Sequence, residues 1–299
     1  MCHTTATFWP MRIQLLTVPY DSGHYGTRMG GGPDALISSG LPARLAESGH
    51  DVRHVEILLP ATAFPAEAQS AFALDRLIAE RVSDSVAAGA LPIVLSGNCI
   101  SSVGTLGGLA LGRIGIIWFD AHGDFNTPET TIGGFLDGMA LAVATGRCWT
   151  SLAATIPGFR PVPEACVVLV GARDLDLAER KLLDTSDVTQ LPPPRFRALF
   201  GSALDDLASR VSDVYLHVDL DVLDPAEGRV NVYAAPGGLR IDEVVSAIGD
   251  IGQRFAVRAA ALTAYDPAYD GDGRVRAAAV RIASAIADAA SLRTLAHET

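Results

Sequence analysis

The chain has 299 residues, a formal net charge of −11 at pH 7 and a mean hydropathy of +0.27. A chain of this length can bury an ample core in one large domain, and its acidic balance argues against nucleic acids and anionic membranes as partners. Membrane insertion and secretion are not expected, because apolar candidates such as residues 277–292 carry charges and the segment before Met11 lacks a signal-peptide pattern.

Residues 1–10 are expected to form a disordered lead-in, and residues 11–299 a single domain. The four cysteines show neither the pairing of a metal site nor the dense spacing of a disulfide framework, which is typical of a cytoplasmic protein. Lys181 is the only lysine among many arginines and alanines, a bias that suggests a GC-rich bacterial genome.

Short apolar runs alternate with longer amphipathic segments along the chain. Strands are expected at residues 13–18, 51–57, 92–95, 114–119, 166–170, 214–220 and 256–262, and the clearest helices at 33–49, 66–89, 241–255 and 273–295. This alternation predicts an α/β fold of three layers, a parallel sheet with helices on both faces. Gly30-Gly31-Gly32-Pro33 lacks the spacing of a nucleotide-binding loop, so it is interpreted as a turn that opens the first helix.

The strand expected at residues 114–119 runs directly into the motif D-A-H-G-D, which contains Asp120, His122 and Asp124. The strand is apolar and rich in β-branched and aromatic residues, as expected of a buried parallel strand. Ligands of open α/β sheets gather at the carboxyl ends of the strands. The motif alone could equally be a helix-capping loop in contact with water.

A second strand repeats the pattern and ends in D-L-D-V-L-D-P, which delivers Asp219 and Asp221. Alternation along a strand points these two carboxylates the same way. Four converging carboxylates would repel one another and be driven to protonate, unless cations neutralise them. Two divalent ions would balance the four charges, so the paired motifs predict a metal centre.

These motifs give the chain a family resemblance that extends from Val18-Pro19-Tyr20-Asp21 to Asp266-Pro267. The chain resembles the arginase (ureohydrolase) family, and residues 124–131 with Asn98-Cys99 are similar to the N-hydroxy-arginine amidinohydrolases. The resemblance implies an arginase-like fold, a homo-oligomer, and hydrolysis of a linear amidine or guanidine C–N bond. The implied substrates are N-hydroxy-L-arginine and L-arginine.

The resemblance also implies a role for individual residues. Two Mn²⁺ ions would share Asp120 and Asp219 and lower the pKa of a water between them. The implied metal ligands are Cys99, Asp120, His122, Asp124, Asp219 and Asp221. Asp124 and Asp137 are the expected catalytic residues, and the expected substrate-binding residues are Asn126, Thr131, Asp176 and Glu179.

Cys99 is the first departure from the family pattern, because the family typically has a metal-binding histidine at this position. Cys99 is either a thiolate ligand or an inert buried thiol at a helix start. Both interpretations predict that the metal position beside it binds Mn²⁺ less tightly than its neighbour, since hard oxygen donors suit Mn²⁺ better than a thiolate does.

Asp137 and Ala264 are the other departures. Arginases have a proton-relaying histidine at the position of Asp137. Asp137 is therefore either a relay with a raised pKa or the N-cap of a helix over residues 138–146. At the position of Ala264, the family presents a glutamate to the guanidinium group of the substrate. Asp266 or Asp270 could replace that glutamate, although Asp266 before a proline equally fits a turn.

These departures leave two rival functions open. One is an arginase-fold hydrolase of a different C–N substrate, such as a formimidoyl or amide compound. The other is a metal-binding pseudoenzyme that serves as a subunit or scaffold. His217, two residues before Asp219, is interpreted as a core or supporting contact rather than a ligand.

Overall fold

The computed structural model describes residues 10–60 and 66–292. Eight strands form one sheet in the order β4-β1-β5-β10-β9-β6-β7-β8, and every neighbouring pair is parallel. The strands are β1 (Arg12–Val18), β4 (Asp51–Glu56), β5 (Ala90–Ser96), β6 (Gly115–Phe119), β7 (Val167–Val170), β8 (Thr189–Leu191), β9 (Asp213–Asp219) and β10 (Ala256–Thr263). All seven predicted strands lie in this sheet. Of the expected lead-in, residues 1–9 lie outside the described residues.

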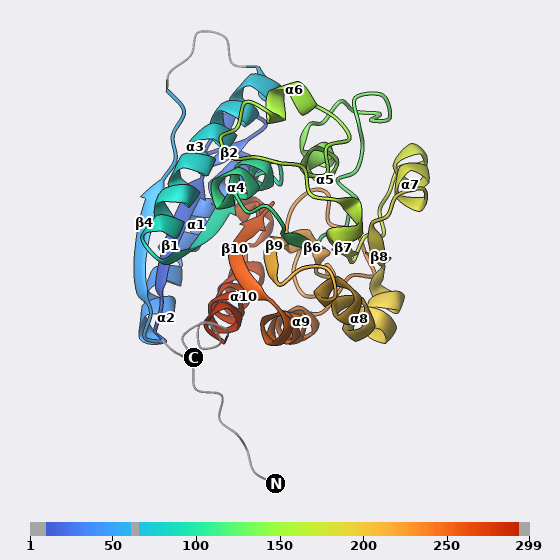
Figure 1. Cartoon of the computed structure of the whole chain (residues 1–299). Helices are drawn as coiled ribbons and strands as arrows, with labels where there is room; N and C mark the ends of the chain where they lie inside the picture. The colour runs from blue at the N-terminus through green and yellow to red at the C-terminus, as the bar shows by residue number, and fades with distance from the viewer. Residues whose placement is uncertain (1–9, 61–65, 293–299) are drawn as a thin grey trace.

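Helices cover both faces of the sheet, which confirms the predicted three-layer α/β architecture (Figure 1). One layer contains α3 (Glu67–Ala87), α4 (Ser101–Leu109) and α5 (Ala140–Ala144); the other contains α1 (Gly32–Ser38), α2 (Leu41–Glu47), α8 (Pro193–Ala208), α9 (Ile241–Arg254) and α10 (Arg274–Ser291). The short helices are α6 (Thr150–Ala153) and α7 (Leu177–Asp184). Among residues 10–60 and 66–292, no helix has the length and apolarity that a membrane span requires.

The helix predicted over residues 33–49 is wrong as a single element, because it is divided into α1 and α2. Gly40 separates them with a φ of 90°, a left-handed conformation that glycine adopts without steric cost. The Gly-Pro run opens the first helix as predicted: Gly30 and Gly31 end the 3-10 turn Arg28–Gly31, and Gly32 and Pro33 begin α1. The helices predicted over residues 66–89 and 241–255 are confirmed as α3 and α9, and that over 273–295 as α10 within the described part.

The register of the central strands brings four chain segments to one edge of the sheet. Thr263 of β10 pairs with Ser96 of β5 on one side and with Asp219 of β9 on the other. Phe119 of β6 pairs with Val218 of β9. The loops that follow these four strands therefore emerge side by side, although they are far apart in the sequence.

Candidate metal centre

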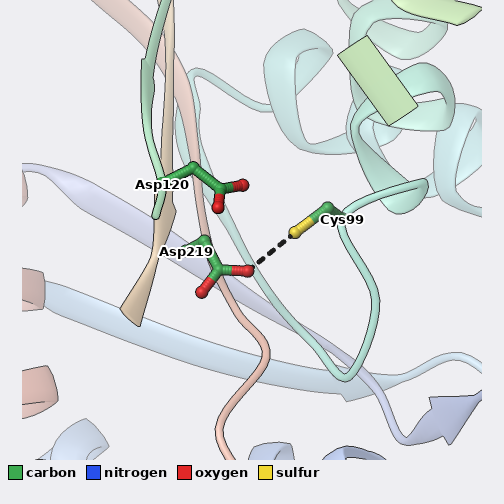
Figure 2. A group of neighbouring side chains, drawn as sticks. All are labelled: Cys99, Asp120 and Asp219. Atoms are coloured by element: carbon green, nitrogen blue, oxygen red, sulfur yellow. Dashed lines mark hydrogen bonds between the residues drawn. The ribbon is translucent and has the colours of Figure 1, made fainter. Parts of the chain in front are cut away.

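Two overlapping groups of possible metal ligands lie at this edge. Cys99, Asp120 and Asp219 form the first group (Figure 2), and Asp120, His122 and Asp221 form the second. The ligand atoms within each group lie within 4.8 Å of one another. The structure thus brings five of the six predicted ligands together, with Asp120 common to both groups.

The local geometry of each motif follows from its two-residue spacing. At the end of β6, Asp120 Oδ1 accepts a hydrogen bond of 2.7 Å from the backbone N–H of His122. At the end of β9, Asp219 Oδ1 accepts the same bond of 2.7 Å from the N–H of Asp221. Each leading aspartate therefore closes a tight turn that carries the next ligand back over the strand end.

The charges of this cluster fit divalent cations. Burial raises the pKa of Asp120, Asp124 and Asp219, and neighbouring carboxylates raise it further. Asp124 is predicted as the sixth ligand, and its Oδ2 is buried without a hydrogen-bond partner. Carboxylate oxygens, one imidazole and an orphaned carboxylate oxygen form a donor set that suits hard divalent ions.

A buried aromatic pair, Trp118 and His217, lies next to the cluster and contacts Asp120. The indole of Trp118 stacks on the ring of His217, with centroids 3.6 Å apart and an interplanar angle of 10°. Trp118 Nε1 also donates to Asp120 Oδ2 at 3.0 Å. Burial lowers the pKa of His217 to about 3, so this ring is neutral. The structure places His217 in the core, as predicted.

Cys99 is a buried hydrogen-bonded thiol in this arrangement. Its Sγ lies 3.1 Å from Asp219 Oδ2 and 3.1 Å from Thr263 Oγ1. Thr263 Oγ1 in turn lies 3.2 Å from His217 Nε2. Burial raises the pKa of the thiol well above its usual value, and the charge of Asp219 raises it further. Cys99 must therefore lose a stabilised proton before it can bind a metal.

A cavity of about 260 Å³ opens above the ligands. It is lined by Met29, Cys99, His122, Asp124, Asn126, Phe135, Asp137, Gly138, Asp174, Asp176, Glu179, Asp219, Asp221, Asn231, Tyr233 and Ala264. Three of the four predicted substrate-binding residues are in this set. Thr131 is not, and its Oγ1 instead accepts a hydrogen bond from the N–H of Gly134 at 3.1 Å.

Comparison with known proteins identifies the family. The model of the arginase family matches residues 11–288. The chain belongs to the arginase family. It is 28% identical to an arginase of Bacillus caldovelox over 287 residues, covering 90% of this chain and 96% of the relative. It is 31% identical to an arginase of Brevibacillus brevis over 228 residues, covering 71% and 76% of the two chains.

Solved structures support the same assignment. The native structure of the arginase from Bacillus caldovelox superposes with a TM-score of 0.85 at 27% identity, and the match covers 92% of this chain and 98% of that one. The predicted arginase-like fold is therefore confirmed, and the protein is a hydrolase of this metal-dependent family.

Asp137 of this arginase-family chain does not cap its own helix, so that interpretation is wrong. It begins the 3-10 turn Asp137–Met139 and receives no N–H from it. Its Oδ1 instead accepts from the backbone N–H of Ile100 at 2.9 Å, and its Oδ2 from Asn98 Nδ2 at 2.9 Å. Burial raises its pKa to about 7 in spite of these bonds.

Ala264 lines the cavity, but neither of the proposed replacements for a glutamate does. Asp266 Oδ1 accepts from the backbone N–H of Ala268 at 3.0 Å, which confirms its role in a turn. Asp270 accepts from the Tyr265 hydroxyl and from the N–H groups that begin α10. The alternative in which one of them replaces the glutamate is wrong, because neither lines the cavity and both are engaged in these local hydrogen bonds.

Phe135, Asn231 and Tyr233 are among the cavity residues that sequence reasoning missed, together with Met29, Gly138 and Asp174. Asn231 is fully buried, and its Nδ2 donates to Ala264 O at 2.8 Å and lies 3.3 Å from Asp221 Oδ2. Phe135, Asn231 and Tyr233 lie on irregular segments without a periodic pattern. Only the position of Asn231-Val232-Tyr233 in the loop after the second aspartate motif hinted at a role.

Proposed function

We propose that this arginase-family hydrolase cleaves a C–N bond of a weakly basic amidine-type substrate, and that N-hydroxy-L-arginine is preferred over L-arginine. The side chain of Ala264 carries the proposal. It lines the cavity at the position where the resemblance expects a glutamate to meet the guanidinium group. A guanidinium cation without a carboxylate partner, close to metal dications, costs several kcal/mol. N-hydroxylation lowers the basicity of the group, so a neutral hydroxyguanidine avoids this cost.

Two buried acids of the cavity, Asp137 and Glu179, do not fully replace the missing charge. Burial raises the pKa of Asp137 and of Glu179 to about 7. Each is therefore partly protonated near neutral pH. A neutral substrate is compatible with such groups, because a protonated carboxyl can donate a hydrogen bond to it.

The proposal assigns two Mn²⁺ ions to the six predicted ligands, with the position beside Cys99 the weaker. Bound Mn²⁺ supplies the positive charge that acidifies water and polarises the scissile group. Asp137, held by Asn98 and Ile100, then exchanges a proton with the leaving amine, a role that its pKa near 7 suits. Asn126, Asp176 and Glu179 orient the remainder of the substrate.

Side-by-side kinetics with added Mn²⁺ test this function. Hydroxyurea release from N-hydroxy-L-arginine is expected with a higher kcat/KM than urea release from L-arginine. Equal values for the two substrates refute the preference. Amine release from formimidoyl or amide compounds alone indicates the other C–N substrate class, and metal binding without any turnover indicates a pseudoenzyme.

A further inference from the structure

A buried asparagine, Asn98, links Asp137 to a second carboxylate. Its Nδ2 donates to Asp137 Oδ2 at 2.9 Å and lies 3.5 Å from Asp21 Oδ1. Its Oδ1 accepts a hydrogen bond from the backbone N–H of Ser22 at 2.8 Å. The side-chain amide therefore favours one orientation, because an inverted amide would turn its oxygen toward two carboxylates and leave the N–H of Ser22 without an acceptor.

Asp21 forms an ion pair with Arg28. The side chain of Asp21 is fully buried. Arg28 Nη2 donates to Asp21 Oδ1 at 2.9 Å, and Arg28 Nε lies 2.9 Å from Asp21 Oδ2. A guanidinium that meets both oxygens of a carboxylate in this way makes a strong and directional pair. Arg28 thus supplies the positive charge that a buried carboxylate requires.

The backbone around this ion pair is strained. Ser22 lies in the turn between β2 (Tyr20–Asp21) and β3 (His24–Tyr25), and Arg28 follows β3. Both have a φ of 48°, in the left-handed region that residues other than glycine rarely adopt. Strain of this kind persists only where the surrounding structure holds it, and it is concentrated at functional sites. The side chain of Arg28 is 55% exposed, so the ion pair with Asp21, and not burial in the core, is what this conformation achieves.

The hairpin of β2 and β3 packs directly on the loop that carries Asn98. A Cβ at Gly97 would overlap the carbonyl of Tyr20, and one at Gly30 would lie 3.1 Å from the backbone nitrogen of Asp21. Glycine at both positions allows this close approach of the backbones. A change at Asp21 therefore acts directly on Asn98.

We propose that Arg28 is a positioning residue for Asp137, and that it acts through Asp21 and Asn98. While Arg28 pairs with Asp21, the amide of Asn98 keeps its Nδ2 toward Asp137, and this donor stabilises the carboxylate form that accepts a proton. The inference rests on the proposed function, in which Asp137 exchanges a proton with the leaving amine. It adds a remote, partly exposed residue on which that exchange depends.

Loss of Arg28 reverses this arrangement. Asp21 is then a buried carboxylate without a cation, which takes up a proton. Its protonated carboxyl donates to the oxygen of Asn98, and the amide turns that oxygen toward Asp137. An oxygen in that position repels a carboxylate, so Asp137 no longer accepts a proton readily.

Kinetics with N-hydroxy-L-arginine on the Mn²⁺-loaded protein test this role. Arg28→Gln is expected to lower kcat about tenfold, a part of the roughly 100- to 10,000-fold that a positioned acid or base contributes. KM is expected to stay within about twofold, because Arg28 is not among the residues that line the cavity. Arg28→Lys keeps the positive charge and is expected to retain kcat within about threefold.

Two further variants separate this effect from a loss of folding. Arg28→Gly removes the guanidinium and also the left-handed strain, so it is expected to fold and to lose kcat as the glutamine variant does. Arg81→Gln is the matched control and is expected to leave kcat unchanged. The side chain of Arg81 has the same exposed fraction, 55%, and pairs with the exposed Asp84 in α3.

A double-mutant cycle shows whether Arg28 acts through Asp137. Asp137→Asn is expected to lower kcat. Arg28→Gln added to this variant is expected to cause no further loss, because the carboxylate that Arg28 positions is already absent. Losses that multiply in the double variant overturn the inference.

Hydrogen exchange of the Asn98 side chain measures the positioning without any turnover. The chain has three asparagines, Asn98, Asn126 and Asn231, so isotope-labelled asparagine gives three side-chain amide groups in an NMR spectrum. Asn98→Ser identifies the group of interest. In the full chain before Mn²⁺ is added, this amide is expected to exchange with solvent more than about tenfold faster in Arg28→Gln than in the unmodified protein or in Arg28→Lys.

An unchanged kcat in both Arg28→Gln and Arg28→Gly overturns the inference, and so does an Asn98 amide that is equally protected in all variants. Failure of the proposed function gives a different result: Asp137→Asn keeps full kcat, or no turnover occurs at all. Protection of the Asn98 amide that depends on Arg28 still supports the positioning of the Asp137 carboxyl in that case.

Discussion

Ala264 is expected to limit how basic a substrate the cavity accepts. Its side chain lines the cavity, its carbonyl is held by Asn231, and its φ is 62°. Ala264→Glu is expected to raise kcat/KM for L-arginine relative to N-hydroxy-L-arginine by about tenfold, or about 1.4 kcal/mol. Ala264→Gln has the same size without the charge and is expected to leave the ratio unchanged. An equal gain with glutamine contradicts the charge argument.

Cys99 is expected to set the balance between the two predicted metal positions. Its thiol donates to Asp219 Oδ2 at 3.1 Å, and a thiolate suits Mn²⁺ poorly. Cys99→His is expected to raise the bound Mn²⁺ from about one to about two ions per chain after dialysis. Elemental analysis measures this change, and Cys148→Ser, another buried cysteine, is the control. Two tightly held ions in the unmodified protein contradict the prediction.

At the scale of elements, the packing of α4 against α3 positions the Cys99 loop. A Cβ at Gly104 would lie 2.5 Å from Asp75 O, and one at Gly108 2.5 Å from Ala79 O. Gly108→Ala is therefore expected to destabilise the fold by about 1–3 kcal/mol in urea denaturation, in spite of the better helix propensity of alanine. Gly201→Ala in α8 meets no atom within 4 Å and is expected to stabilise. A loss of stability in Gly108→Ala together with a gain in Gly201→Ala shows that close packing, and not helix propensity, determines the effect at Gly108.

The Arg147–Glu164 pair joins the segment after α5 to the turn before β7. Arg147 donates to both oxygens of Glu164, and the N–H of Asp187 donates to one of them. These bonds lower the pKa of Glu164, with Arg147 as the main cause. The pair therefore stabilises the fold above the ordinary glutamate pKa, and this contribution is lost as pH falls through the lowered value.

Glu164→Gln is accordingly expected to cost about 1 kcal/mol of unfolding free energy at pH 7, as for a partly exposed ion pair. The difference from the unmodified protein shrinks below a pH of about 4. Denaturation at several pH values measures it. An undiminished difference at about pH 3 shows that packing, not charge, is responsible.

The sequence predicts elements where the local pattern is strong and misses them where it is weak. The apolar runs of β6 and β9 define their strands and place the aspartates at the sheet edge. α4 escapes prediction because Gly104, Gly107 and Gly108 lower its helix propensity, and tertiary packing, mainly against α3, compensates for them. β8 has three residues, too few to show a period.

The residues of the candidate site also differ in whether the sequence predicts them. The four motif aspartates were predicted because each follows a strand end with fixed spacing. Phe135, Asn231 and Tyr233 reach the cavity through irregular loops, whose paths depend on tertiary contacts. The sequence leaves two roles possible for Asp137, because only the fold shows that Asn98 and Ile100 donate hydrogen bonds to it.

For the whole molecule, metal binding should couple to stability. Buried carboxylates gather at one edge of the sheet, and a cation that binds only the folded chain stabilises it. Removal of Mn²⁺ by a chelator is expected to lower the melting temperature by roughly 4 °C, for a loss of about 2.7 kcal/mol. Asp120→Asn should abolish this response, because Asp120 belongs to both ligand groups. A full response in that variant contradicts the shared-ligand assignment.

The homo-oligomer that the family resemblance implies is also a prediction for the whole molecule. Light scattering of the purified protein measures the assembly, and a trimer or hexamer is the expected result.

Asn231 has one further consequence, because its side chain contacts the predicted metal ligand Asp221, the carbonyl of Ala264 and the backbone N–H of Tyr233. Metal binding at Asp221 and ligand binding beside Tyr233 are therefore expected to be thermodynamically coupled. Such coupling is reciprocal. If a ligand beside Tyr233 changes the affinity for Mn²⁺ by some factor, Mn²⁺ changes the affinity for that ligand by the same factor. With a factor above one, the protein is expected to hold its metals most tightly while substrate is present and to release them most readily when the pocket is empty.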